Sequence, residues 1–190
     1  MENTDYRFCE DITQYKRLST RTVYVGNIPL GGDYPVRIQS MTNTDTGDTK
    51  ATSEQIKRIA DNGADFVRMT TRTIKEAENL QSIKQQLQSD GYSLPLVADV
   101  HFNPKIAETA AKLVEKVRIN PGNYSLKHAQ KGEFEEVKEN FLRLLDICKK
   151  HKTTIRIGVN HGPLSQRIMD EHGDTPKGMV KSAMEFLRIC

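Results

Sequence analysis

Charged and amide side chains recur at the carboxyl ends of four candidate strands. The candidate substrate-binding residues are Arg68, Asp99, His101, Arg118, Asn120, Arg156 and Asn160. Arginine suits phosphate binding because its planar guanidinium can donate two parallel hydrogen bonds to one phosphate group. The aspartate and the histidine add titratable groups, and the two asparagines add neutral donors and acceptors. These residue types favour a site for a small phosphorylated metabolite.

The elements that must position these residues alternate between short β-type runs and helical runs from residue 36 onward. The strand candidates are Val36–Met41, Asp65–Thr70, Leu94–His101, Lys116–Asn120 and Thr153–Asn160. Such alternation predicts parallel strands joined by crossover helices. The length of each unit matches a TIM barrel, which divides about 250 residues among eight units. We therefore expect an α/β fold, a partial TIM (β/α)8 barrel with about five βα units.

Within each candidate strand, residues two apart share a face. In the fifth strand, Ile155 and Ile157 share one face, whereas Arg156 and Asn160 share the other. Burying an unpaired charge in a barrel costs several kcal/mol. Since four strands carry polar residues on one face near their carboxyl ends, we predict a polar pocket at that mouth, where barrel enzymes place their chemistry.

An antiparallel sheet with one solvated face would show the same alternation without forming a site. Helical segments of crossover length after each strand disfavour that interpretation. Any one of the charged residues, taken alone, is explained more simply as a surface residue or a member of a local ion pair. The first strand shows a weaker version of the pattern, with Gln39 and Met41 on one face. The prediction of a site therefore depends on repetition over several strands.

Helix signals and an N-terminal hairpin complete the predicted organisation. Thr73 opens a capping-box pattern, and Asn103 and Thr175 each precede a first-turn proline. Residues 23–32 resemble a small hairpin that would close the bottom of a barrel. We divide the chain into residues 1–35, an N-terminal segment with the hairpin, and residues 36–190, the first five βα units of a barrel whose later strands lie outside this sequence.

Composition and charge exclude several classes of protein. The 190 residues are 36% hydrophobic and 28% charged, which is typical of a soluble globular domain. The net charge of +3 is too small to indicate a nucleic-acid surface. No stretch approaches the roughly 20 apolar residues of a membrane span, and the N-terminus lacks the apolar region of a signal peptide. We predict no nucleic-acid or membrane partner and a cytoplasmic location.

The three cysteines, Cys9, Cys148 and Cys190, lie far apart and form no CxxC pair. Neither a disulfide framework nor a zinc site is indicated, and unpaired thiols fit a reducing compartment. Cys148 continues an apolar stripe with Phe141 and Leu144 at helical spacing, so we expect it in the core. We assign no metal ligand and no cofactor-binding residue to this chain.

Four strand segments closely resemble the 4-hydroxy-3-methylbut-2-enyl diphosphate synthase family, of the methylerythritol phosphate route to isoprenoids. They are residues 36–45 (VRIQSMTNTD), 96–102 (LVADVHF), 117–123 (VRINPGN) and 155–160 (IRIGVN). The resemblance runs through nearly all 190 residues. Residues 6–10, 15–17 and 161–169 are similar to the long form of the family, which has an extra domain between the barrel and a C-terminal iron–sulfur domain.

The resemblance implies an oxidoreductase that opens and dehydroxylates 2-C-methyl-D-erythritol 2,4-cyclodiphosphate, using electrons that ferredoxin or flavodoxin supplies to a [4Fe–4S] cluster. In the family the barrel holds the diphosphate, and the seven candidate residues match its substrate-binding motifs. The cluster ligands and the acidic catalytic residue belong to a later part of the family's chain. We therefore expect this sequence to be a piece of a longer protein that does not bind the cluster and is inactive alone, with catalytic residues unknown.

Two alternatives remain open. The chain would be a non-catalytic phosphate-binding or self-associating half-barrel module if its open sheet edges pair with other copies in a homo-oligomer. It would be a pterin-binding barrel related to dihydropteroate synthase if the basic mouth serves that ligand, although fold alone does not determine function. A discrete oligomer without ligand affinity would favour the first alternative.

Overall fold

A five-stranded parallel sheet forms the centre of the computed structural model, which describes residue 13 and residues 19–101, 103–124, 133–160, 162 and 164–190. The strands, in both sequence and spatial order, are β3 (Gln39–Met41), β4 (Phe66–Thr71), β5 (Leu96–Val100), β6 (Lys116–Ile119) and β7 (Thr154–Ile157). Each neighbouring pair is parallel. The predicted α/β barrel wall is confirmed, and the antiparallel alternative is wrong.

The two edge strands are shorter than predicted. β3 begins at Gln39 rather than Val36, whose side chain is 72% exposed. β7 ends at Ile157, three residues before Asn160, and its last paired residue is Ile157 opposite Ile119. Among the described residues each of these strands pairs on one side only, so fewer hydrogen bonds hold its ends in extended form.

Six α-helices and one 3₁₀ turn occupy the described connections. They are α1 (Thr49–Asp61), α2 (Ile74–Ser89), α3 (Pro104–Ala110), η1 (Pro121–Tyr124), α4 (Glu133–His151), α5 (Gln166–His172) and α6 (Pro176–Ile189). The predicted caps are present: the Oγ1 atoms of Thr73 and Thr175 each accept a backbone N–H hydrogen bond at 3.1 Å. The Oδ1 atom of Asn103 does the same at 2.9 Å. No helix in the described ranges is long and apolar enough to cross a bilayer.

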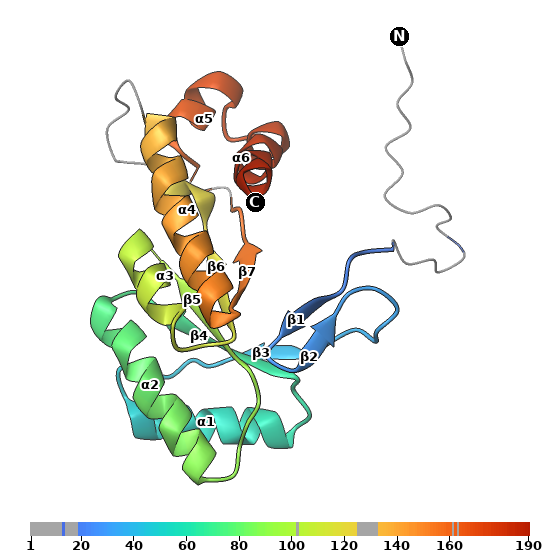
Figure 1. The fold of residues 1–190 in the computed structure, drawn as a ribbon, viewed down its shortest axis with the longest axis vertical. Coiled ribbons are helices and arrows are strands. Elements are labelled where there is room, and N and C mark those ends of the chain that lie inside the picture. The colour runs from blue at the N-terminus through green and yellow to red at the C-terminus, as the bar shows by residue number, and fades with distance from the viewer. Residues whose placement is uncertain (1–12, 14–18, 102, 125–132, 161, 163) are drawn as a thin grey trace.

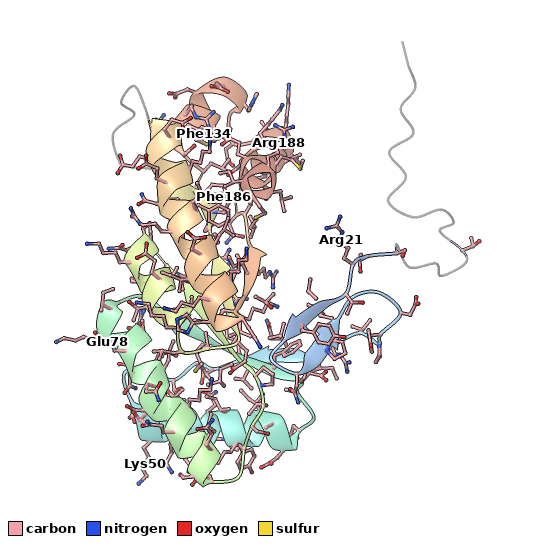
Figure 2. All side chains as sticks on the ribbon, in the orientation of Figure 1. Arg21, Lys50, Glu78, Phe134, Phe186 and Arg188 are labelled. Carbon is pink, nitrogen blue, oxygen red and sulfur yellow. The ribbon has the colours of Figure 1, made fainter. Side chains whose placement is uncertain are left out.

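The helices pack on one face of the sheet, here called the outer face. Figure 1 shows α1 to α4 along this side of the strands. Fully buried side chains such as Met69 and Val117 meet the helices there. Phe186 on α6, labelled in Figure 2, packs against α4, with its ring centroid 4.7 Å from that of Phe141. Cys148 is buried in the same cluster, which confirms the prediction that it belongs to the core.

The N-terminal hairpin packs on the opposite face, here called the inner face (Figure 1). Its strands, β1 (Val23–Val25) and β2 (Ile28–Leu30), are antiparallel. Val25 is fully buried against Phe66 and Val97, near the amino ends of β4 and β5. The hydroxyl of Thr154 on β7 donates to the carbonyl oxygen of Tyr24. The hairpin therefore covers the amino end of the sheet, as predicted, and leaves the carboxyl ends of the strands for a site.

Candidate functional site

Strand register places three of the predicted site residues in one row across the inner face. Asp99 on β5 is the register partner of Arg118 on β6, and Arg118 is the partner of Arg156 on β7. Thr70 on β4 continues the row on the other side of Asp99. Since register partners in neighbouring strands point to the same face, these side chains are neighbours although they lie far apart in sequence.

Asp99 is the centre of the cluster, and its side chain is only 3% exposed. One carboxylate oxygen accepts a hydrogen bond from Arg68 Nη2, and the other accepts one from Arg118 Nη1 at 3.2 Å. His101 Nε2 lies 3.4 Å from Oδ2 of the same carboxylate. Burial raises the pKa of Asp99, but the hydrogen bond from Arg68 and the charges of Arg68 and Arg118 outweigh it, so the pKa lies below its usual value. The ionised carboxylate therefore links two guanidinium groups.

A glycine directly after the next strand, β7, accepts a further hydrogen bond from Arg118. Arg118 Nη2 donates a hydrogen bond of 2.7 Å to the carbonyl oxygen of Gly158. A Cβ atom at position 158 would overlap Arg118 Nε, so glycine leaves room for this side chain in its present orientation. The sequence interpretation did not identify Gly158 as a functional residue. A glycine within a strand pattern was the available signal, because it often marks the close approach of another group.

The remaining predicted residues, Arg156, Asn120 and Asn160, differ in their burial and in their distance from Asp99 along the strands. Arg156 is exposed and, within the part of the chain that the structure describes, makes no hydrogen bond or ion pair. Asn120 is buried two residues after Arg118, and its Oδ1 accepts a hydrogen bond of 3.1 Å from the N–H of Gly122. Asn160 is exposed beyond the end of β7, and no described contact joins it to Asp99. Two of the three arginines thus converge on Asp99, and the third, Arg156, lies beside them with no partner among the described residues.

The charges of this row and of Arg68 beside it do not cancel. Three guanidinium groups, those of Arg68, Arg118 and Arg156, face one ionised carboxylate, that of Asp99. Because Asp99 is shared by two arginines, neither arginine is neutralised by a carboxylate of its own. A surplus of positive charge on a partly buried surface favours a small multivalent anion, and guanidinium donors held by existing hydrogen bonds lose little freedom when they bind it.

The described residues do not fit an iron–sulfur cluster. Such a cluster needs several cysteine thiolates near one another. Cys148 is buried in the core, where burial raises the pKa of its thiol to about 12, and Cys190 is exposed at the end of α6. No group of three or more His, Cys, Asp or Glu residues within the described ranges could hold a metal ion. Cys9 lies outside the described residues.

Relatives with known names match this chain over most of its length. A curated relative from Bacteroides thetaiotaomicron, named 4-hydroxy-3-methylbut-2-en-1-yl diphosphate synthase (flavodoxin), is 55% identical over 95% of this chain and 31% of its own. A chloroplastic relative from Oryza sativa subsp. japonica, named as the ferredoxin form of that enzyme, is 47% identical over 97% of this chain and 26% of its own. The chain therefore spans a third or less of the length of these relatives.

Comparison of folds adds a weak likeness, and comparison with protein families gives a specific match. A solved dihydropteroate synthase from Xanthomonas albilineans overlaps 87% of this chain and 60% of its own at 15% identity, with a TM-score of 0.48. A likeness at this level says nothing about function. Residues 20–190 match the GcpE TIM-barrel domain, a range that includes the hairpin and every strand of the sheet. As the resemblance predicted, the chain belongs to the GcpE TIM-barrel domain family.

Proposed function

We propose that this chain is the diphosphate-binding part of a 4-hydroxy-3-methylbut-2-en-1-yl diphosphate synthase, an oxidoreductase of isoprenoid biosynthesis. Its ligand is 2-C-methyl-D-erythritol 2,4-cyclodiphosphate. Family membership and the names of the relatives support the reaction class. The observation on which the proposal depends is the row of Asp99, Arg118 and Arg156, where guanidinium groups outnumber carboxylates.

The residues of the row and their neighbours Arg68 and His101 have separate tasks in binding. Asp99 holds Arg68 and Arg118 in fixed orientations, so their remaining N–H groups are preorganised for phosphate oxygens. Arg156 is free to turn toward the ligand and form a bidentate contact. His101 lies at the rim beside Asp99, where its ring can donate or accept a hydrogen bond at the ligand.

We infer that the whole protein uses a [4Fe–4S] cluster, which supplies electrons to the substrate, and that flavodoxin or ferredoxin reduces it. Cysteines outside this chain hold the cluster, because the described residues offer no suitable set of ligands. This chain therefore binds the diphosphate without turning over the substrate, and measured turnover by the 190 residues alone would contradict this. The free thiols of Cys148 and Cys190, the two described cysteines, support a reducing cytoplasm as its location.

Titration calorimetry with inorganic pyrophosphate tests the proposed site. Arg118→Ala and Arg156→Ala should each weaken binding by about ten- to a hundredfold, since each removes a charge-assisted contact. Arg188→Ala is the matched control, because Arg188 is an exposed arginine on α6 (Figure 2). If all three variants lose affinity equally, or if the wild type binds no pyrophosphate, the proposal is wrong.

Exposed apolar residues favour self-association as a second function. Val180, Met184 and Leu187 recur at i, i+4 and i+7 on α6 and are 61%, 37% and 52% exposed. The edge strand β3 is preceded by Val36 and Ile38, which are also exposed. A second copy of this chain would cover these surfaces. Sedimentation equilibrium should then show a discrete dimer that Leu187→Glu dissociates and Lys177→Glu does not, whereas a monomeric wild type would contradict self-association.

A further inference from the structure

Strand β4 extends beyond the end of its neighbour β3 at the carboxyl end of the sheet. β3 stops at Met41, the register partner of Arg68, whereas β4 continues to Thr71. On its other side, β4 remains paired with β5 as far as Thr71. The last carbonyl groups of β4 that point toward β3 therefore need partners from outside the ladder, because a buried carbonyl without a hydrogen bond is destabilising.

The segment that follows β3, residues 42–48, supplies these partners. The N–H of Thr42 donates to the carbonyl oxygen of Arg68 at 2.9 Å. The hydroxyl of Thr46 then donates to the carbonyl oxygen of Thr70 at 2.7 Å. Thr46 is only 2% exposed, so solvent cannot readily replace it as the donor. A side-chain hydroxyl thus takes the place of a strand N–H beside β4.

Side chains from two helices hold the same segment from its other side. Asn79 on α2 donates from Nδ2 to the carbonyl oxygen of Thr46 at 2.8 Å, and its Oδ1 accepts from the hydroxyl of Thr49 on α1 at 2.9 Å. Thr52 on α1 is fully buried and donates from its hydroxyl to the carbonyl oxygen of Asp45 at 2.8 Å. Thr46 therefore links the helix layer to β4.

The hydrogen bond from Thr46 reaches β4 at the point where this strand presents Arg68. Arg68 lies two residues before Thr70, so the two side chains share the inner face. The guanidinium of Arg68 pairs with the buried carboxylate of Asp99, which is the register partner of Thr70 on β5. Because this ion pair joins neighbouring strands, a displacement of the β4 backbone at Thr70 changes its geometry.

We propose that Thr46 is a positioning residue, which fixes the carboxyl end of β4 and thereby the orientation of the Arg68 guanidinium toward Asp99. Thr46 itself needs no contact with a ligand, since it acts through the backbone of Thr70. The consequence for ligand affinity rests on the proposed function, in which Arg68 contacts the diphosphate. The consequence for Arg68 itself does not, and it can be measured without a ligand.

Thr46→Val tests the inference, because valine has nearly the shape of threonine but lacks the hydroxyl. In protein labelled with ¹⁵N at arginine, the Nε–H signal missing from Arg68→Lys identifies Arg68, whose Nε is buried. Exchange of this proton with solvent should be about ten- to a hundredfold faster in Thr46→Val, since the carbonyl of Thr70 loses its partner and β4 opens more often. Thr46→Ser retains the hydroxyl and should restore the wild-type rate.

Thr44→Val is the matched control, because it makes the same substitution in the same segment. The hydroxyl of Thr44 lies 2.9 Å from that of Thr52, so its hydrogen bond is to α1 rather than to β4. This variant should leave the exchange rate of Arg68 unchanged. Equal acceleration in Thr44→Val and Thr46→Val, or no recovery in Thr46→Ser, would mean that general loosening of the segment is responsible, and the inference would be wrong.

Asn79→Ala tests the same connection from the helix side. It removes the donor to the carbonyl of Thr46 and leaves the hydroxyl of Thr46 in place, so it is the milder variant. Exchange at Arg68 should rise by about threefold or more. This variant also decides the matter if Thr46→Val does not fold, since an unchanged rate in Asn79→Ala would overturn the inference.

Calorimetry with inorganic pyrophosphate separates this inference from the proposed function. Thr46→Val should bind pyrophosphate about tenfold more weakly than the wild type, and Thr44→Val should bind it equally well. If the exchange rates change as expected but the wild type binds no pyrophosphate, the proposed function is wrong and Thr46 still positions Arg68. If Arg118→Ala weakens binding while Thr46→Val changes neither exchange nor affinity, the proposed function stands and the inference is wrong.

Discussion

The outer and inner faces of the sheet are built from alternate residues of the same strands, but they have opposite physical requirements. Met69 and Val117 on the outer face are fully buried beneath the helices, where volume and apolarity are sufficient. Arg68, Asp99 and Arg118 on the inner face are partly or fully buried as well, but each needs a hydrogen-bonding partner. The outer face therefore stabilises the fold, and the inner face is organised for a ligand.

The largest expected effect is on the outer face, where Phe141→Ala removes a fully buried ring that contacts Tyr124 and Phe186. The variant should lose about 3–5 kcal/mol of unfolding free energy, because it leaves a cavity among aromatic side chains. Urea denaturation followed by circular dichroism measures this loss. The adjacent Leu142, which is 41% exposed, is the control, and Leu142→Ala should cost less than about 1 kcal/mol. Equal losses would contradict the difference in packing.

On the inner face, Asp99→Asn should cost about 1.5–3 kcal/mol of unfolding free energy at neutral pH, since it weakens two charge-assisted hydrogen bonds. It also leaves Arg68 and Arg118 facing each other without a carboxylate between them. Asp45→Asn is the control, because the Asp45 carboxylate is part of a local turn and accepts from the N–H of Gly47 at 2.8 Å. Its unfolding free energy should change little.

The effect of Asp99→Asn should depend on pH with a defined sign. The pKa of Asp99 is lowered in the folded state, so its contribution is complete above the unfolded-chain value of about 3.9. The contribution is lost as the pH falls from that value through the folded-state pKa. The difference between wild type and variant should therefore shrink in acid, and a difference that grows in acid would show that Asp99 is not ionised in the fold.

The sequence predicts the two faces well, because each depends on local information. Alternation along single strands identified the polar inner side chains, and the N-cap residues Thr73 and Thr175 marked where α2 and α6 begin. The partner of each charge depends on register between strands instead. A single strand does not show that Asp99 would bind two arginines, or that Arg156 would have no partner among the residues that the structure describes.

The ends of the edge strands and the burial of Lys116 were harder to predict, because both depend on contacts between strands. Asn160 would share the face of Arg156 if the strand continued, because the two are an even number of residues apart. Strand pairing stops at Ile157, so alternation no longer determines where the Asn160 side chain points. Lys116 lies two residues before Arg118 and shares its face, but the sequence pattern identified it only as the first residue of a strand. It is only 7% exposed, and its Nζ lies 5.6 Å from the ring centroid of Phe66 on β4, a long-range neighbour that strand periodicity does not encode.

The smallest expected effect on stability, and the sharpest test of the inner face, comes from Gly158→Ala. A single methyl group would overlap Arg118 Nε, so Arg118 must move away from Asp99 and from the carbonyl of Gly158. The unfolding free energy should fall by about 1 kcal/mol, because overpacking is relieved by a side chain that can shift.

Pyrophosphate affinity measured by calorimetry should fall about tenfold or more, since the displaced guanidinium loses its fixed orientation. Gly162→Ala, where a Cβ meets no atom of the described residues within 4 Å, should change neither quantity. Unchanged affinity in Gly158→Ala would mean that the orientation of Arg118 is not what binds the anion.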